Sequence, residues 1–356
     1  MKKMDKKTLT LIEFGVVASV GALALIGAST LIGYTKRAKP ARIQHDTLEY
    51  SDEKIQDLIK EGYIPIATAE ELNSIRNTSP RFYGVGTKWK APYTGGLSER
   101  YVQVANIDLS EYGDWTPIGA VHSNFRGTYD GGNYVITGLE VKGEGKNNQG
   151  LFGRAEGATI SNVGLIDNKV TGSYFVGGLV GYATNKTEIR NSYATGSVEG
   201  TDNVGGLVGG ANNSMISNSY STGLVKGSAV LGGLVGGAYY STISNSYTTG
   251  LVVGRTQLGG LVGKAARGGE ISNSYSIGLV KGSGENVGGL IGLAESVVAI
   301  TESYWDTETT GRTMSARQDE SFGKTTEEMK KQTTYSDWDF VNVWKIDKGN
   351  GYPKLR

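Results

Sequence analysis

The most regular feature of the chain is a hydrophobic block, rich in glycine, that returns every 27 to 29 residues from Leu151 to Leu290. The block reads Gly-Gly-Leu-Val-Gly or a close variant and centres on Leu151, Leu179, Leu207, Leu234, Leu261 and Leu290. An Asn-Ser-Tyr block recurs 13 or 14 residues after five of these leucines, at Tyr193, Tyr220, Tyr247 and Tyr275, with a degenerate copy at Tyr304. Such self-similarity indicates a repeat architecture whose units bury their apolar face only against neighbouring units.

Within one repeat the residues alternate with a period of two, which is typical of strands. Ile216, Asn218 and Tyr220 share one parity, and the intervening serines have the other. Glycine and β-branched residues fill the unit, a composition that disfavours helix. About 27 residues per coil suit two or three short strands, with glycine expected at corners of positive φ. The pattern therefore predicts that each repeat is one coil of a β-structure.

Proline is absent between Pro117 and Pro353, as expected where every amide hydrogen takes part in a ladder. We predict a mainly β fold, a parallel β-solenoid over 150–304, right-handed and with coils about 4.8 Å apart. The repeat length varies only at Thr201–Asn203 and Tyr182–Glu188 and their equivalents, which we therefore expect to be loops.

The N-terminal region carries one long apolar run in place of repeats. Residues 9–33 are interrupted only by Glu13, after a lysine-rich start. A helix of this length spans roughly 37 Å, enough for a membrane core of about 30 Å. A carboxylate inside such a helix costs about 2.5–3.5 kcal/mol, which makes Glu13 a candidate functional residue.

Three interpretations of this segment remain open. Residues 22–24 (Ala-Leu-Ala) would suit a cleaved secretory signal, and the length suits an uncleaved transmembrane anchor. Residues 10–14 (Thr-Leu-Ile-Glu-Phe) resemble the start of type IV pilins and their Flp/Tad-like relatives. That resemblance implies a prepilin leader cut between Thr8 and Leu9, with Glu13 acting in filament assembly opposite a neighbouring subunit's amino terminus. The family prefers glycine at the position of Thr8.

The remaining segments predict small α/β caps around the solenoid. The expected divisions are a leader (1–8), a membrane or pilin-like helix (9–34), a linker with a short helix (35–62), an N-terminal α/β cap (63–149), the solenoid (150–304) and a C-terminal cap (305–356). Thr68 with Glu71, and Thr325 with Glu328, have the spacing of helix-capping boxes. A further short helix is expected from Ser51 to Glu61.

The tryptophans near the C-terminus are the candidates for closing the stack. Trp305, Trp338, Phe340 and Trp344 are expected to cover the open apolar end of the last coil, as solenoid ends must be capped. A sugar-binding aromatic platform is the functional alternative for these residues.

The composition excludes several classes of protein. The 356 residues include 54 glycines, 6 prolines and no cysteine, with a net charge of +1. Because the Gly-X-Y period is absent, the chain is not collagen. Without cysteine there is no disulfide scaffold, thiolate metal site or cysteine nucleophile. The small net charge gives no case for a nucleic-acid partner, and we expect no cofactor or metal.

The repeats also carry a family resemblance. Residues 204–209 (Val-Gly-Gly-Leu-Val-Gly), followed by 216–223 (Ile-Ser-Asn-Ser-Tyr-Ser-Thr-Gly), are similar to the GLUG-motif repeat of bacterial surface and secreted proteins. The similarity runs from about Ile107 to the end. It implies a cell-surface or extracellular location and, by analogy with large adhesins, a role in adhesion. Some relatives carry peptidase domains beside the repeats, but the motif His-Glu-x-x-His is missing here, and the histidines are His45 and His122.

An enzyme is the competing class, because some β-solenoids cleave polysaccharides with two nearby carboxylates. The acids within 150–304 form no Asp-x-Asp pair, and Glu199 with Lys226 one coil on is expected to form a surface ion pair. We therefore predict no catalytic residues. Tyr239 and Tyr240 are the candidate ligand contacts. The expected function is an extracellular structural or adhesive subunit whose partners are pilin-like subunits or the membrane, and a host or environmental surface that includes glycan. The alternative is a secreted or anchored polysaccharide lyase or hydrolase.

Overall fold

The computed structural model describes residues 49–76, 80–83, 91–94, 96–119, 123–318, 320–347 and 351–356. The predicted leader, the apolar helix at 9–34, the cleavage residues Thr8 and Leu9 and the assembly residue Glu13 lie outside them. Within the described residues, no helix has both the length and the apolar character to cross a membrane.

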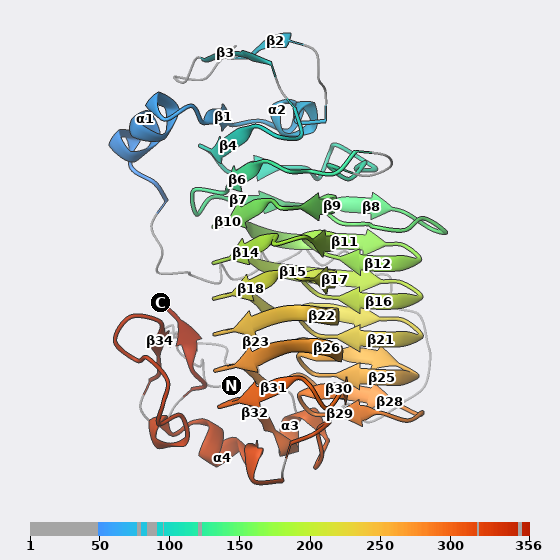
Figure 1. Cartoon of the computed structure of the whole chain (residues 1–356). Coiled ribbons are helices and arrows are strands. Elements are labelled where there is room, and N and C mark those ends of the chain that lie inside the picture. The colour runs from blue at the N-terminus through green and yellow to red at the C-terminus, as the bar shows by residue number, and fades with distance from the viewer. Residues whose placement is uncertain are drawn as a thin grey trace, which may run out of the picture. The chain divides into compact units, whose positions relative to one another are not determined.

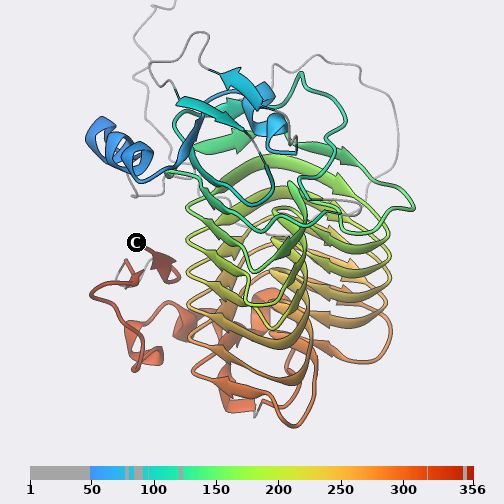
Figure 2. The ribbon, with the colours of Figure 1, turned by 45° about the horizontal axis from the view of Figure 1, so that its top comes forward.

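The described chain winds into coils that stack one upon another, with parallel strands in register from coil to coil (Figures 1 and 2). This confirms the predicted mainly β, parallel β-solenoid. The coils build three sheets, which we name the first, second and third sheet.

The first sheet contains two rows of strands that merge where β22 and β26 run through both. One row is β1 (Ile64–Ile66), β4 (Arg100–Gln103), β6 (Thr128–Asp130), β10 (Thr159–Ser161), β14 (Glu188–Arg190), β18 (Met215–Ser217), β22 (Val235–Ser244), β26 (Val262–Ser272) and β31 (Ala299–Thr301). The other adds β9 (Phe152–Glu156), β13 (Val180–Thr184), β17 (Val208–Asn212) and β30 (Ile291–Ala294).

The second and third sheets complete each coil. The second contains β5 (Ile107–Asp108), β7 (Val135–Thr137), β8 (Glu140–Lys142), β11 (Gly164–Thr171), β15 (Tyr193–Glu199), β19 (Tyr220–Ser221), β20 (Leu224–Lys226), β23 (Tyr247–Thr248), β24 (Val252–Gly254), β27 (Tyr275–Ser276), β28 (Val280–Gly282), β32 (Tyr304–Asp306) and β33 (Gly323–Lys324). The third contains β12 (Tyr174–Gly177), β16 (Asp202–Gly205), β21 (Ala229–Gly232), β25 (Thr256–Gly259) and β29 (Val287–Gly288). Both predicted loops overlap strands: Thr201–Asn203 includes the start of β16, and Tyr182–Glu188 includes the end of β13 and the start of β14.

The parallel ladder begins before the predicted boundary at residue 150. Strands β1, β4 and β6, within the segment expected to be an α/β cap, pair in parallel with one another and with β10. The rest of this segment includes α2 (Ala69–Ser74) and an antiparallel hairpin of β2 (Pro80–Tyr83) and β3 (Ala91–Thr94). Helix α1 (Asp52–Lys60) precedes the first coil, and Thr68 and Glu71 form the predicted capping box of α2.

The corners of the coils are built by asparagine more than by glycine. Asn162, Asn191, Asn218, Asn245 and Asn273 stack at one corner with φ between 47° and 58°. The expectation that glycine supplies these corners was wrong, since asparagine tolerates the left-handed region. The glycines of the repeat block are needed mainly for close approach: a Cβ on Gly232 would lie 1.9 Å from the carbonyl oxygen of Val235.

The left-handed asparagine also reverses which side of the coil the next residues face. Ile216 before the corner is fully buried in the interior core, whereas Tyr220 after it belongs to a separate apolar cluster outside the coil. The period of two therefore does not continue through Asn218.

The C-terminal segment folds back along the second sheet (Figures 1 and 2). It contains α3 (Thr307–Thr310), η1 (Glu320–Phe322), α4 (Thr326–Met329), η2 (Gln332–Thr334) and an antiparallel pair of β34 (Trp344–Lys345) and β35 (Lys354–Leu355). Thr325 and Glu328 form the predicted capping box of α4.

The C-terminal aromatic residues divide between two places. Trp305 is fully buried in the interior core and closes the last coil. Trp338, Phe340 and Trp344 instead pack with the tyrosines on the outside of the second sheet. The prediction that all four cover the open end was therefore wrong for three of them, because the tyrosine column offers them an apolar surface along the side of the coils.

Candidate functional site

The two candidate tyrosines lie on strand β22 but face different surroundings. Tyr239 is half-buried, and its ring lies over Gly237, where an added Cβ would approach it to 2.8 Å. Tyr240 is the next residue and takes a left-handed conformation with φ 51°. It is 56% exposed. The structure therefore assigns the two side chains to separate surfaces.

Tyr239 belongs to a row of partly exposed rings that we call the aromatic face: Phe175, Tyr182 and Tyr239, with Arg154 and Arg267. The rings of Phe175 and Tyr182 stack with centroids 4.4 Å apart. The guanidinium of Arg154 lies 5.4 Å from the centre of the Tyr182 ring, and that of Arg267 lies 5.9 Å from the centre of the Tyr239 ring. Each end of the face therefore carries a cation over an aromatic ring.

Glycine makes room for these rings on the outside of the coils. The ladder position occupied by Arg154 and Tyr182 is glycine in the next two coils, at Gly210 and Gly237. A Cβ at Gly210 would come within 2.6 Å of the Phe175 ring. A larger residue at either glycine would displace the rings that lie over it.

A polar edge adjoins the aromatic face. The hydroxyl of Tyr239 donates to Oδ1 of Asn203 at 3.4 Å, and Nδ2 of Asn203 donates to Oδ1 of Asp202 at 2.7 Å. Burial raises the pKa of Asp202, partly offset by the donors of Asn203 and the charge of Lys264. Burial, then the Asp202 charge, raises the pKa of Tyr239. The face thus offers aromatic rings, an amide and cations to a ligand, beside the carboxylates of Asp202 and Glu295.

Tyr240 lines a shallow groove that Tyr239 does not line. The groove has a volume of about 280 Å³, and Lys186, Glu188 and Met215 also line it. Met215 is 43% exposed. One exposed tyrosine and one methionine between opposite charges form a small contact surface.

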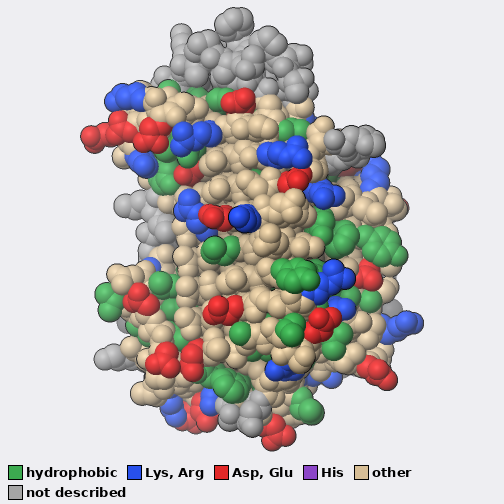
Figure 3. Space-filling model, viewed as in Figure 1, with side chains coloured by type: hydrophobic (Ala, Val, Ile, Leu, Met, Phe, Trp, Pro, Cys, Tyr) green, Lys and Arg blue, Asp and Glu red, His purple; other side chains and the backbone are tan. Residues whose placement is uncertain are grey.

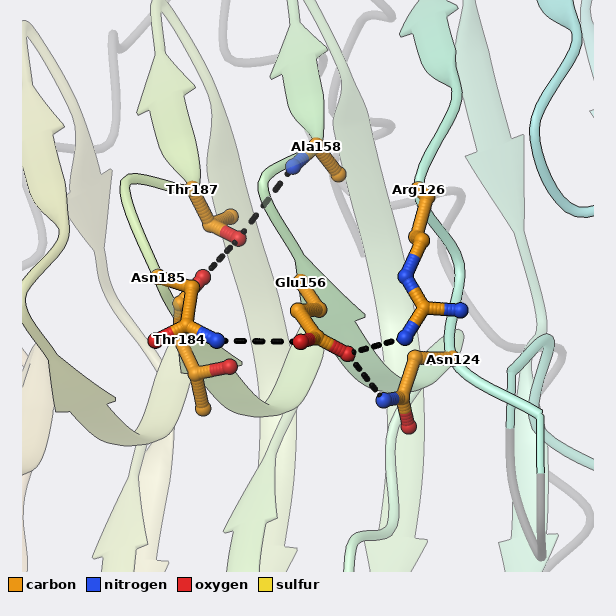
Figure 4. Close-up of polar contacts among 7 residues, drawn as sticks. All are labelled: Asn124, Arg126, Glu156, Ala158, Thr184, Asn185 and Thr187. Carbon is orange, nitrogen blue, oxygen red and sulfur yellow. Dashed lines mark hydrogen bonds and ion pairs between the residues drawn. The ribbon is translucent and has the colours of Figure 1, made fainter.

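The carboxylate of Glu156 occupies a corner near the start of the solenoid (Figure 4). It accepts hydrogen bonds from Nδ2 of Asn124, from Nη2 of Arg126 at 2.6 Å and from Nδ2 of Asn185 at 2.9 Å. Nearby, Thr187 Oγ1 donates to the Thr184 carbonyl oxygen at 2.8 Å and accepts from the Ala158 amide at 3.4 Å.

These donors decide what Glu156 can do chemically. Hydrogen bonds from Asn124 and Asn185, together with Arg126, lower the pKa of Glu156. A glycosidase's general acid needs the opposite shift, because it must stay protonated near neutral pH. Glu156 is therefore suited to holding its corner against Asn124, Arg126 and Asn185 by hydrogen bonds, and not to acid catalysis.

A second carboxylate on the coils, that of Glu199, is also paired with a cation. Glu199 and Lys226 form the predicted ion pair at 2.7 Å, with both side chains 54% exposed. In the part of the chain that the structure describes, no group of three or more His, Asp or Glu residues could hold a metal ion. On the face shown in Figure 3, acidic, basic and hydrophobic side chains are interspersed over the coils.

The sequence singled out Tyr239 as a candidate contact, but not Phe175, Tyr182 or the two arginines that lie in the same row. These residues occupy different positions of the repeat and meet only because neighbouring coils stack. An alignment of the repeats upon one another contains a usable signal, since Tyr182 stands where the next two coils have glycine.

Comparisons with known proteins identify the repeat motif and a solved structure with a similar fold. Residues 172–199, 200–226 and 254–280 match the GLUG motif. The chain is 36% identical over 98 residues to halomucin of Haloquadratum walsbyi, and 36% identical over 91 residues to an immunoglobulin A1 protease of Streptococcus sanguinis. These matches cover 27% and 26% of this chain but only 1% and 4% of those relatives.

Among solved structures, the chain is similar to a candidate immunoglobulin A1 protease from Bacteroides ovatus. The TM-score is 0.61 at 21% identity, over 86% of this chain and 93% of that one. At this identity the similarity shows a shared fold. The chain is therefore a parallel β-solenoid that contains GLUG motifs.

Proposed function

We propose that the protein is an extracellular structural and adhesive subunit in which the solenoid presents its aromatic face to a glycan. The observation that carries the proposal is the row of Phe175, Tyr182 and Tyr239 flanked by Arg154 and Arg267. Four coil intervals of about 4.8 Å separate the two arginines, so the face extends roughly 19 Å along the coil axis. An extended ligand fits such a row better than a compact one.

The chemistry of the face suits sugars. An aromatic ring packs against the apolar C–H side of a sugar ring, and a nearby polar group orients the hydroxyls. Asn203 supplies an amide at the edge of the face, where the Tyr239 hydroxyl donates to it. The N–H groups of the arginines can donate hydrogen bonds to the oxygen atoms of either neutral or acidic sugars.

The extracellular location is supported by the GLUG motifs and by the matches to halomucin and an immunoglobulin A1 protease. In this proposal the described coils act by binding and display, without catalysis. The protein's net charge of +1 supports a partner other than nucleic acid. Incubation with a panel of polysaccharides tests the absence of catalysis: cleavage abolished by one Asp or Glu substitution would contradict it.

The N-terminal part of the proposal assigns residues 9–34 to membrane anchoring or to assembly into a pilus-like filament. It rests on the apolar run with its lone Glu13 and on the resemblance of residues 10–14 to type IV pilins. Mass spectrometry of the native N-terminus tests it. A chain beginning at Leu9 supports filament assembly, whereas an intact Met1 supports anchoring only.

Binding to immobilised glycans tests the adhesive role. The full chain is compared with the double variant Tyr182→Ala/Tyr239→Ala, and Met314→Ala, which changes a side chain 66% exposed, is the control. We expect the double variant to lose most of the binding and the control to keep it. Equal binding by all three proteins would contradict the role of the aromatic face.

A further inference from the structure

A second recess lies on a different side of the coils, between the asparagine corner and the C-terminal segment. It has a volume of about 270 Å³. Asn162, Asn191 and Asn218 line one wall, and Asn342, Val343 and Arg356 line the other. None of these residues belongs to the aromatic face.

The asparagine wall is a bonded column. Nδ2 of Asn218 donates to Oδ1 of Asn191 at 3.2 Å, and Nδ2 of Asn191 donates to Oδ1 of Asn162 at 3.1 Å. Asn162 in turn donates to Oδ1 of Asp130 at 2.9 Å and to the hydroxyl of Tyr50 at 3.0 Å. These bonds fix the orientation of every amide in the column.

The column still has donors for a ligand. Each asparagine amide carries two hydrogens, and the bonds along the column occupy one each at Asn191 and Asn218. Successive coils repeat the amides about every 4.8 Å. The wall therefore presents a short, rigid row of hydrogen-bonding groups.

The opposite wall combines polar and apolar groups. Asn342 is exposed, and its Nδ2 donates to Oδ2 of Asp339 at 2.9 Å, which holds the amide in place. The guanidinium of Arg356 donates to the carbonyl oxygens of Trp344 and Phe340, each at 3.0 Å. Val343 contributes an apolar surface beside these groups.

The size of the recess limits the ligand. A volume of about 270 Å³ equals about nine water molecules at about 30 Å³ each, far more than one bridging water needs. It lies just below the range of about 300–1,000 Å³ that is typical of ligand pockets, which restricts the ligand to a small molecule.

We propose that this recess binds a single pyranose, as a free sugar or as the end of a glycan chain. A pyranose has hydroxyls around its rim and apolar C–H faces. It therefore matches a site with an amide column on one side and Val343 on the other. The bound sugar contacts both the coils and the C-terminal segment, and so links the two.

The test uses the full chain with the aromatic face removed by Tyr182→Ala/Tyr239→Ala, so that failure of the adhesive proposal leaves this test unaffected. Saturation-transfer difference NMR is recorded with the methyl pyranosides of glucose, galactose and mannose and with N-acetylglucosamine. The further variants are Asn342→Leu and Asn191→Asp, each of which removes an amide donor. Val341→Ala is the control, because Val341 is 78% exposed in the same segment.

We expect at least one probe to bind, and each amide variant to weaken that binding about fivefold, the value for one lost hydrogen bond. The Val341→Ala control keeps the original affinity. If no probe binds, the recess holds water only and the proposal is overturned. Binding that neither Asn342→Leu nor Asn191→Asp weakens would place the sugar elsewhere and also overturn it.

Discussion

The solenoid has two apolar columns, one inside the coils and one outside, and they are closed in different ways. Inside, residues such as Leu207 and Val208 are fully buried by the winding of the chain and by the coils on either side. Outside, Tyr220, Tyr247 and Tyr275 stack with centroids 4.8 and 5.1 Å apart and nearly parallel rings. Each new coil extends both columns, but only the interior column is covered by the repeats themselves.

The outer column is covered by the non-repeating C-terminal segment. The ring centroid of Trp344 lies 6.2 Å from that of Tyr247 and 6.0 Å from that of Tyr275. Trp338 stacks on Trp344 with the ring centroids 4.5 Å apart. A buried carboxylate fastens this segment: Asp306 accepts from the hydroxyls of Thr326 and Tyr352, both at 2.7 Å. The repeat therefore specifies the rod, whereas protection of its tyrosine side depends on residues outside the repeat.

The largest effect is expected from Leu207→Ala in the interior column. Leu207 is fully buried between neighbouring coils. Its truncation should therefore lower the free energy of unfolding by about 4 kcal/mol, through lost transfer energy and the cavity left behind. Urea unfolding followed by far-ultraviolet circular dichroism measures the change. Met215→Ala, at a side chain 43% exposed, is the control. Equal effects of the two substitutions would contradict the interior core described here.

The next effect, on the outer column, should be local. Trp344 is fully buried and packs on the tyrosines. Trp344→Ala should therefore weaken docking of the C-terminal segment by about 3 kcal/mol, near the lower limit for removing a buried tryptophan. Hydrogen exchange should accelerate in residues 320–356 while the interior strands stay protected, with Val341→Ala as the control. Loss of protection throughout the coils would show that the two columns unfold as one unit.

The same comparison explains how far sequence reasoning reached. Residues equivalent to Leu207 and Tyr220 recur at a nearly constant spacing. This spacing was enough to predict the coils, because in-register stacking requires a nearly constant repeat length. The side on which Tyr220 lies was not predictable from alternation, since Asn218 takes a left-handed conformation and reverses it. Trp344 packs on the tyrosines outside the coils. Because the outward position of those tyrosines was not predicted, the position of Trp344 was not predicted either.

The candidate binding surface was only partly predictable for a related reason. Tyr239 stands out as one of two adjacent tyrosines, but its neighbours Phe175 and Tyr182 come from earlier coils and from other positions of the repeat. Their proximity follows from the winding of the chain together with the missing side chains at Gly210 and Gly237. Neither is visible as a local motif.

A smaller effect, which concerns only the tyrosines of the outer column, is expected at high pH. Burial raises the pKa of Tyr275 well above its usual value of about 10, and the pKa of Tyr247 is also raised by burial. The folded state therefore binds these protons more tightly than the unfolded state. Their contribution to stability is complete below about pH 10 and is lost as the pH rises through the folded values.

Tyrosinate absorbance measures this prediction. In the native chain the absorbance of the column should rise only together with loss of the far-ultraviolet dichroism of the coils. In Trp344→Ala part of that rise should come first, because Tyr247 and Tyr275 have lost their cover. Identical titrations of the two proteins would mean that the segment does not control access to the column.

The smallest effect concerns the polar corners, which belong to neither column. The pKa of Glu156 is lowered by Asn124, Asn185 and Arg126, so its stabilising contribution is present above the unfolded value of about 4.3. That contribution is lost as the pH falls through the folded pKa. Glu156→Gln should therefore lower the thermal midpoint slightly at neutral pH, and the two proteins should converge in acid. The exposed Glu188→Gln serves as the control. A constant difference at every pH would mean that Glu156 acts through packing, and that charge adds nothing to what the two apolar columns supply.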